Sequence, residues 1–280
     1  MELVPAHHYT FEQLTEAYNQ TRVDYLVPMP MNVARLREYV RVYDIDLANS
    51  CVCAEGNTLL GLGMLGVRGR EGWITRLGVL PAGRRRGVGS AIMAELLRNA
   101  AALGLEEVWL EVIKGNAPAH ALFRKFGFTE TRELIIARRP PKPASQTPPE
   151  VISQVTALDH EEAIILLSHR KSRPSWITHT GTMQNVRNLS ALQVELENGG
   201  RGWVTYHGGL LQLTRIIVEV TKGDPVEVTE TILRLMHHRH KRQDAKTENI
   251  PNDAIWQGFK RAGYFDSFRR IEMVKKLGTG

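Results

Sequence analysis

The stretch ITRLGVLPAGRRRGVGS, residues 74–90, is the part of the sequence from which the fold can be argued. A β-branched and apolar run from Ile74 to Leu80 stops at Pro81, and an arginine- and glycine-rich loop then leads into a helical pattern. Glycine lets backbone N–H groups approach an anion closely, a helix N-terminus carries a partial positive charge, and arginine adds charge-assisted hydrogen bonds. The stretch is therefore a candidate cradle for a pyrophosphate.

The length and composition of the chain are those of a globular protein. With 280 residues it can bury a substantial core and is more readily two domains than one. The 36 Lys and Arg against 30 Asp and Glu would suit an anionic ligand or a nucleic acid, but the excess is mild for this length. The N-terminus lacks the basic and apolar regions of a signal peptide, and the longest apolar stretch, Leu59 to Val67, is too short to span a bilayer. We therefore expect a cytoplasmic protein with no membrane partner.

Hydrophobic periodicity predicts a mixed succession of helices and strands in the first half of the chain. After a short opening strand, helices are expected over Phe11–Asp24, Val33–Tyr43, Val88–Gly104 and Ala117–Lys125, strands over Ser50–Ala54, Thr58–Val67, Trp73–Leu80 and Glu107–Ile113, and a final hairpin over Thr129–Arg139. Three strands in succession imply an antiparallel arrangement, whereas a strand, a helix and a strand imply a parallel crossover.

A proline-rich segment separates two parts of the chain. The sequence RRPPKPASQTPPE, residues 138–150, contains five prolines and cannot form a packed core, so we predict a semi-extended linker over residues 140–150. Beyond it the chain repeats itself: ITRLGV (74–79) recurs as LTRIIV (213–218), and NAPAHALFRKFGF (116–128) recurs as NDAIWQGFKRAGY (252–264). The matches come in the same order at nearly the same offset, which favours a duplicated domain over chance similarity of short apolar motifs.

The second copy lacks the cradle. Where the first has Arg84 to Gly89, the second has GDPVEV (223–228), with two acidic residues and no glycine at either loop position. Carboxylates at these positions would repel a diphosphate. The repeat therefore predicts one cofactor site, in the first copy.

The order of motifs along the first copy resembles the GCN5-related N-acetyltransferase (GNAT) family. The motifs are Val79-x-Pro81, Arg84-x-x-Gly87-x-Gly89, a helix, a strand, and Asn116 followed by Leu122-Phe123-x-x-Phe126-Gly127-Phe128. The resemblance covers about residues 1–139 and, more weakly, about 150–278, and the tandem layout resembles that of mycothiol synthases. It implies an α/β (α+β) protein made of two tandem acyl-CoA N-acyltransferase (GNAT) folds, each a mixed, mostly antiparallel sheet flanked by helices. Residues 1–139 would be the acetyl-CoA-binding catalytic domain and residues 151–280 a degenerate GNAT-like domain.

The resemblance also implies where acetyl-CoA, the co-substrate, would lie. The sheet of the family splays between its fourth and fifth strands, and the cofactor lies in that cleft. The backbone of Leu77 and Val79 would hold the pantetheine and the acyl carbonyl, residues 84–90 would surround the pyrophosphate, and Asn116 would contact the pantetheine arm from the far side. The expected cofactor-binding residues are Leu77, Val79, Arg84, Arg85, Arg86, Gly87, Val88, Gly89, Ser90, Asn116 and Phe123.

Rival interpretations of the loop fit less well. A Rossmann fingerprint would need a glycine where Ile92 stands, and a P-loop would need Gly-Lys-Ser/Thr. The alternative is that the arginines at 84–86 form only a solvated basic turn.

Acyl transfer to an amine needs a donor to the developing oxyanion and a base for the amine proton. The strand N–H near Val79 is a candidate donor. The candidate bases are Glu71, Asp44, His120 and Glu111, and each could instead be a surface or cap residue. We choose Glu111 as the catalytic base, because its strand should line the acceptor side.

Phe123 departs from the family pattern. Many members have a tyrosine there that donates a proton to the leaving thiolate, and phenylalanine cannot. A thiolate with a pKa of about 8.5 can leave with little proton donation, and water can serve as the donor.

The histidines at the end of the second copy's long helix, His237, His238 and His240, could clasp a metal. The basic residues among them indicate instead a solvated, cationic helix end, so we expect no metal site, and a nucleic-acid patch there is a less favoured alternative.

Other conspicuous side chains have structural interpretations. Trp176, Trp203 and Trp256 are expected in the core of the second domain or in its contact with the first. Cys51 and Cys53 would point to the same face of one strand, where disulfide geometry is poor, so we expect two buried apolar residues.

The function predicted from the sequence is N-acetyl transfer. The N-terminal domain would move an acetyl group from acetyl-CoA to a primary amine by direct attack. The partner would be a small-molecule or peptide amine that no motif identifies, with nucleic acid disfavoured, and the chain would be a monomer with an internal pseudo-dimer or a homodimer. The alternative, favoured by Phe123 and the lack of an obvious base, is a non-catalytic acyl-CoA-binding sensor or interaction module.

Overall fold

The chain divides into two compact units. The computed structural model describes residues 1–24, 26–141 and 151–278. The first unit comprises Met1–Thr131 and Ile271–Gly280, and the second comprises Arg132–Arg270. This division differs from the predicted boundaries, 1–139 and 151–280, because the last strand of the chain returns to the first unit. The predicted linker falls largely on residues 142–150, which lie outside the described residues.

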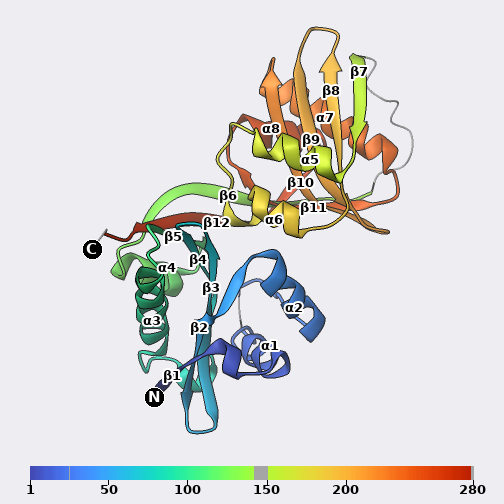
Figure 1. The fold of residues 1–280 in the computed structure, drawn as a ribbon. Coiled ribbons are helices and arrows are strands. Elements are labelled where there is room, and N and C mark those ends of the chain that lie inside the picture. Colours follow the sequence, from blue (N-terminus) through green and yellow to red (C-terminus); the bar gives the residue numbers. More distant parts are fainter. Residues whose placement is uncertain (25, 142–150, 279–280) are drawn as a thin grey trace. The chain divides into compact units, whose positions relative to one another are not determined.

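The first unit is a sheet with helices on both faces (Figure 1). Its elements are β1 (Glu2–Pro5), the 3₁₀ helix η1 (Ala6–His8), α1 (Phe11–Gln20), α2 (Val33–Val42), β2 (Ile45–Glu55), β3 (Thr58–Arg68), β4 (Glu71–Val79), η2 (Pro81–Gly83), α3 (Val88–Ala102), β5 (Glu107–Ile113) and α4 (Ala117–Lys125). Strands β1 to β4 are antiparallel neighbours, and β4 and β5 are parallel. The predicted mixed, mostly antiparallel sheet flanked by helices is confirmed.

Helix α3 forms the crossover between β4 and β5, and its apolar side explains two glycines of β3. Ile92, Met93 and Leu96 are completely buried. A Cβ atom at Gly61 or at Gly63 would lie 2.8 or 2.6 Å from the Ile92 side chain, closer than carbon atoms can approach. Because glycine has no Cβ, α3 can pack directly on the middle of the sheet. Helices α1 and α2 cover the opposite face (Figure 1).

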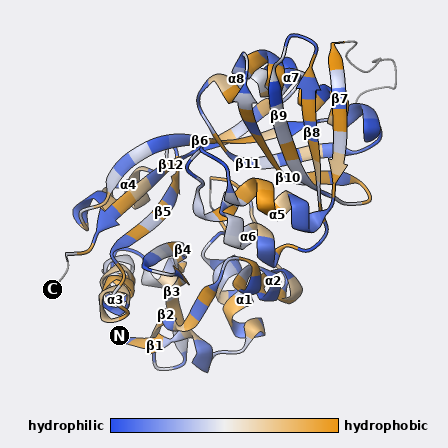
Figure 2. Cartoon of the chain, turned by 45° about the horizontal axis from the view of Figure 1, so that its top comes forward, coloured by the Kyte–Doolittle hydropathy of each residue, from blue (hydrophilic) through white to orange (hydrophobic). Residues whose placement is uncertain are grey.

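The second unit repeats the order of strands and α-helices of the first, although the 3₁₀ helices of the two units differ. Its elements are β7 (Ile152–Leu158), α5 (His160–Ser168), η3 (Trp176–Thr178), α6 (Thr180–Asn185), β8 (Leu189–Leu196), β9 (Arg201–Gly208), β10 (Gln212–Lys222), α7 (Pro225–Arg239), β11 (Asp244–Pro251) and α8 (Ala254–Arg261). Strands β7 to β10 are antiparallel neighbours, and β10 and β11 are parallel. In Figure 2 the strands and helices of each unit show bands of apolar and polar residues, as expected for elements with one buried side.

The closing strands differ from the prediction. Instead of a hairpin over Thr129–Arg139 there is one strand, β6 (Thr129–Arg139), and the second copy closes with one strand, β12 (Phe265–Lys276). The 129–139 run contains no glycine, asparagine or proline that could form a hairpin turn. In the first unit the neighbour of β5 is β12, and in the second unit the neighbour of β11 is β6. The strand beside β5 therefore comes from the second copy of the sequence, and the strand beside β11 comes from the first.

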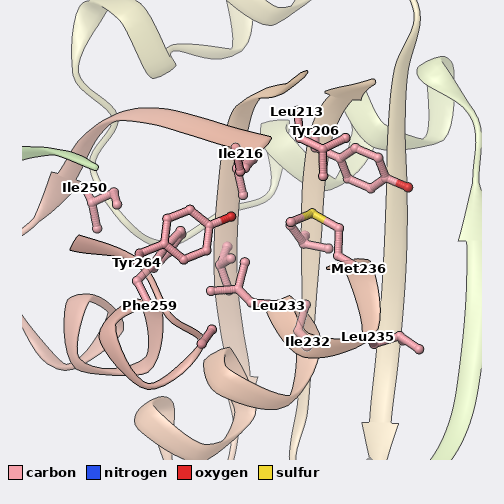
Figure 3. Packing of buried hydrophobic residues seen from close by; sticks show 14 of the residues in the cluster. Tyr206, Leu213, Ile216, Ile232, Leu233, Leu235, Met236, Ile250, Phe259 and Tyr264 are labelled. Atoms are coloured by element: carbon pink, nitrogen blue, oxygen red, sulfur yellow. The ribbon is translucent and has the colours of Figure 1, made fainter. Parts of the chain in front are cut away.

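The core of the second unit lies between its sheet and helices α7 and α8. Figure 3 shows Leu233 and Met236 of α7 together with Phe259, Tyr264 and Ile216, all of which are buried. The predicted core residues Trp176, Trp203 and Trp256 are 7%, 4% and 2% exposed, so their burial is confirmed.

His237 was expected at a solvated helix end, and that prediction is wrong. The side chain is 4% exposed, and its Nε2 lies 2.8 Å from the hydroxyl of Tyr264. Burial lowers the pKa of His237 to about 3, and the charges of Arg139 and His240 act in the same direction. The neutral imidazole is thus part of the core.

Cys51 and Cys53 are buried and not bonded to each other, as predicted. Burial raises the pKa of Cys51 to about 12, which makes this thiol a poor nucleophile. Over the described ranges of the chain, none of the helices combines the length and the apolar character that a membrane span requires.

Candidate functional site

The candidate site begins where β4 and β5 separate. Their parallel pairing runs from Glu71 opposite Glu107 to Ile74 opposite Leu110 and ends there, although β4 continues to Val79. Just beyond the last pair, Arg76 has a φ of 53°, and the register with β3 shifts at the same point. This β-bulge increases the local twist of β4, which turns its last residues out of the ladder with β5. The predicted splay of the sheet is therefore built by a bulge.

The loop after β4 leads into the N-terminus of α3. Gly87 precedes α3 with a φ of 80°, a conformation that favours glycine. No side chain accepts a hydrogen bond at this N-terminus, whereas every other α-helix of the described ranges has a side-chain cap. The exposed N–H groups and the helix dipole are suited to an anion.

The three arginines of the loop are in different environments. Arg84 makes two hydrogen bonds to the carboxylate of Asp24, at 2.6 and 2.5 Å. Arg86 makes two to Glu55, both at 2.9 Å. These guanidinium groups lower the pKa of the Asp24 and Glu55 carboxyls. Arg85 is exposed, with a φ of 60°, and forms no ion pair within the described residues.

The start of α3 lies against two other predicted elements. A Cβ at Gly89 would be 3.4 Å from the Val79 side chain and 3.5 Å from that of Leu122, so the end of β4, the start of α3 and the side of α4 meet here. Val88 is buried, and Ser90 is half-buried. The structure thus brings the predicted residues 77–79 and 84–90 together around the N-terminus of α3.

Asn116 and Phe123 both belong to α4, but to different environments. Asn116 caps the helix, accepting a hydrogen bond from the Ala119 N–H at 3.3 Å. Phe123 is 7% exposed and packs in the apolar cluster, with its ring centroid 6.3 Å from that of Phe128. At position 123 the structure therefore places an apolar core residue and no proton donor.

Of the four candidate bases, only Glu111 stands next to the separation of the strands. It follows Leu110, the last residue of β5 that pairs with β4, and is half-buried. Glu71 begins β4 at the paired end, Asp44 accepts from Arg68 Nε at 2.6 Å, and the ring of His120 lies 2.8 Å from Glu130.

A group of polar side chains near Glu111 was not predicted from the sequence. The hydroxyl of Tyr39 lies 2.7 Å from that of Thr75, and the guanidinium of Arg76 lies 4.3 Å from the Tyr39 ring and 5.1 Å from the Tyr18 ring. Burial raises the pKa of Tyr39, and the negative charge of Glu111 adds to the increase. The recurrence of Thr-Arg in both copies was the signal that could have drawn attention to Arg76.

In the second unit the corresponding strands also separate, but a side chain of the protein bridges the separation. Strands β10 and β11 pair only at Gln212 with Asp244 and Leu213 with Ala245, and Arg215 has a φ of 54°. The Thr247 hydroxyl donates to the Ile216 carbonyl at 2.8 Å.

The helix that follows β10 is also capped. Asp224 accepts hydrogen bonds from the N–H groups of Val226 and Glu227, both at 2.8 Å. The Asp224 side chain thus accepts from the first N–H groups of α7, whereas no side chain of the described residues accepts from those of α3.

Among the described residues, no group of three or more His, Cys, Asp or Glu side chains is close enough to hold a metal ion.

Part of the first unit resembles known proteins in sequence. Residues 12–128 match the acetyltransferase (GNAT) family. A mycothiol acetyltransferase of Clavibacter michiganensis subsp. michiganensis is 42% identical over 81 residues, which is 29% of this chain and 26% of that protein. The chain thus matches only about a quarter of the length of this curated relative.

Solved structures share the fold over the whole chain. A tandem GNAT protein from the clavulanic acid biosynthesis pathway, with 15% identity, has a TM-score of 0.67 over 100% of this chain and 99% of that one. A GCN5-related N-acetyltransferase from Sphaerobacter thermophilus, with 13% identity, has a TM-score of 0.70 over 99% of this chain and 95% of that one. The predicted tandem fold is confirmed by these similarities.

Proposed function

We propose that the first unit binds acetyl-CoA and transfers the acetyl group to a primary amine, because residues 12–128 match the acetyltransferase (GNAT) family. The observation that carries the proposal is the start of α3. It combines a helix N-terminus without a side-chain cap, Gly87 in the left-handed region and the exposed Arg85. These groups fit a diphosphate in charge and in hydrogen-bonding capacity.

The separated end of β4 would hold the rest of the cofactor. The backbone of Leu77 and Val79 lies beyond the last pair with β5, and Gly89 brings the start of α3 against Val79. The pantetheine arm would follow β4, with Asn116 at the start of α4 on its far side. Acetyl-CoA, when bound, supplies a thioester that an amine attacks directly. The N–H near Val79 would donate to the carbonyl oxygen as its negative charge develops.

Glu111 is the base in this proposal. A typical amine is protonated at neutral pH, so a proton must leave before the nitrogen can bond to the carbonyl carbon. Glu111 follows the last paired residue of β5 and would accept this proton directly or through a water molecule. The carbon–sulfur bond then breaks, the thiolate leaves, and the nitrogen gives up its second proton to water as the amide forms. Because the Phe123 side chain has no acidic proton to donate, the thiolate leaves unprotonated or takes a proton from water.

Isothermal titration calorimetry with acetyl-CoA tests the binding step. We expect a single site per chain, abolished by Gly87→Glu combined with Gly89→Glu, with the thermal unfolding of the variant as the control for folding. Two sites, or binding that survives the double change, would contradict the proposal.

Thiol release from acetyl-CoA tests the catalytic step. A panel of primary amines, amino acids and peptides should contain an acceptor with saturable turnover, and Glu111→Gln should lower kcat by about 100-fold or more. The second candidate function, a non-catalytic acyl-CoA sensor, is favoured by the burial of Phe123. It predicts binding of acetyl-CoA without turnover for every amine.

A further inference from the structure

The ion pair between Arg84 and Asp24 occupies a guanidinium group that the sequence analysis assigns to the cofactor. The two guanidinium nitrogens of Arg84 lie 2.6 and 2.5 Å from the two carboxylate oxygens of Asp24. Arginine binds carboxylates and phosphates through the same planar pair of N–H donors. A diphosphate at the start of α3 and the carboxylate of Asp24 would therefore compete for one side of Arg84.

Asp24 belongs to the connection between α1 and α2, of which the structure describes residues 21–24 and 26–32. The later part of this connection is fixed to α1, since the Tyr18 hydroxyl donates to the Met29 carbonyl at 3.1 Å and Asn19 makes two hydrogen bonds with Met31, at 2.9 and 3.0 Å. The same Tyr18 hydroxyl accepts a hydrogen bond from Arg76 at 3.0 Å. This part of the connection therefore adjoins the polar group near Glu111, the base in the proposed function.

The earlier part of the connection is held to the loop of residues 84–89, here called the cradle loop, by the ion pair of Asp24 with Arg84. Val23 and Leu26, on either side of Asp24 in the chain, are 69% and 61% exposed, so burial of these apolar side chains does not hold them in place. The side chains of Asp24 and Arg84 are themselves 60% and 40% exposed. A solvent-exposed ion pair is weak enough to be displaced by a more highly charged anion.

We propose that Asp24 is a positioning residue that couples cofactor binding to the acceptor side. Before the cofactor binds, Asp24 holds Arg84 and ties residues 21–24 to the cradle loop. The diphosphate takes the place of the carboxylate, and the connection is released. By linkage, the cofactor thereby favours whatever arrangement of residues 21–32 the released connection adopts, and an acceptor that binds this arrangement binds better after the cofactor. The inference rests on the proposed acetyl-CoA site.

Glu55 provides a matched control. It pairs with Arg86 through two hydrogen bonds of 2.9 Å, but it lies at the end of β2 and not in the α1–α2 connection. Loss of the Glu55 charge should free a cradle arginine as loss of the Asp24 charge does, without any effect on residues 21–32.

The experiment combines calorimetry with hydrogen exchange for the wild type, Asp24→Asn and Glu55→Gln. Both variants should bind acetyl-CoA about two- to fivefold more tightly than the wild type, because an exposed competitor has been removed. In the wild type, acetyl-CoA should increase amide exchange in peptides that cover residues 21–32. In Asp24→Asn this exchange should already be high without ligand and should not rise further, whereas Glu55→Gln should behave as the wild type.

Three results would overturn the inference alone: weaker or unchanged binding of acetyl-CoA by Asp24→Asn, a fall in exchange over residues 21–32 when the wild type binds, or the same exchange pattern in both variants. Failure of the wild type to bind acetyl-CoA at all would overturn the proposed function and this inference with it.

Discussion

The N-terminus of α3 and the N-terminus of α7 are the same place in two copies of one fold, and their backbone N–H groups are satisfied in different ways. Both helices have 15 residues, and both follow a strand with an arginine at positive φ, Arg76 at 53° and Arg215 at 54°. At α7 the carboxylate of Asp224 accepts two N–H groups. At α3 the preceding residue is Gly87, which has no side chain to offer. The second copy therefore caps this helix with a side chain, and within the described residues the first copy does not.

The two units also differ where their parallel strands separate, β4 from β5 and β10 from β11. In the second unit the Thr247 hydroxyl donates across the separation to the carbonyl of Ile216. The residue of the first unit that aligns with Ile216 is Leu77, whose backbone is assigned to the pantetheine under the proposed function. The two copies therefore share the bulged strand and the crossover helix, and they differ in the side chains that bond to the backbone around them.

The largest expected effect comes from giving α3 the cap of α7. Gly87→Asp should weaken acetyl-CoA binding about 100-fold relative to Gly87→Asn, because the carboxylate charge would repel the diphosphate. Aspartate and asparagine have similar size and a similar tolerance of positive φ, so the comparison isolates the charge. Calorimetry measures the two affinities. Equal affinities would show that the N-terminus of α3 does not contact the diphosphate.

The next largest expected effect is a pH dependence of stability that comes from His237, at a position where the cores of the two units differ. By alignment of α3 with α7, Ala100 occupies the place of His237, and Phe128 occupies that of Tyr264. The pKa of His237 is near 3 in the folded protein, against about 6.5 when unfolded, so the unfolded chain binds the proton preferentially and the stability falls as the pH drops below about 6.5.

His237→Gln should remove this dependence. The wild type should lose about 2 kcal/mol more than the variant between pH 7.5 and pH 5 in urea unfolding, since glutamine can keep the hydrogen bond to Tyr264 but does not titrate. Parallel pH profiles for the two proteins would refute the assignment of a neutral, buried His237.

A smaller effect is expected from loss of the hydrogen bond between Thr247 and Ile216, which joins the separated strands β10 and β11. Thr247→Val should destabilise the second unit by about 1–2 kcal/mol, because the buried carbonyl of Ile216 would lose its donor. Thr247→Ser, which keeps the hydroxyl, is the control. The measurement is the free energy of unfolding in urea, and a valine variant as stable as the serine variant would mean that the bridge is dispensable.

The smallest effect is expected at the cap of α7. Asp224→Ala should cost about 1 kcal/mol of unfolding free energy, and Asp224→Asn, which can still accept from the helix, should cost less. Neither change should create a second acetyl-CoA site, because the second unit lacks the glycines and arginines of the cradle loop. A calorimetric stoichiometry near two for Asp224→Ala would contradict the view that several side chains separate the two copies.

The elements with strong local signals could be predicted from the sequence. The strand from Ile74, the glycine-rich start of α3 and the cap at Asn116 depend on residues close together in the chain. The bulges at Arg76 and Arg215 could not be predicted, since arginine gives no sign that its φ will be positive. The ion pair of Arg84 with Asp24 joins residues 60 positions apart and depends on how α1 packs on the sheet.

Two errors have physical causes. His237 was interpreted from the basic residues after it, although it continues the apolar stripe of Ile232, Leu233 and Met236 at helical spacing, which is the better indicator of burial. The exchange of β6 and β12 was not foreseen because the two closing strands belong to copies of the same fold. Either could therefore pair beside β5, and the sequence of one strand does not specify which does.

That exchange has a consequence for biosynthesis. Residues 271–276 belong to the first unit, yet the ribosome makes them after all of the second unit, residues 132–270. At ordinary translation rates the nascent first unit waits about ten to thirty seconds for its last strand. During that interval the edge of β5 is an open template for any other extended chain. A fragment that stops at residue 131 should keep this open edge permanently, and a synthetic peptide with the sequence of residues 271–276 is the natural ligand with which to close it.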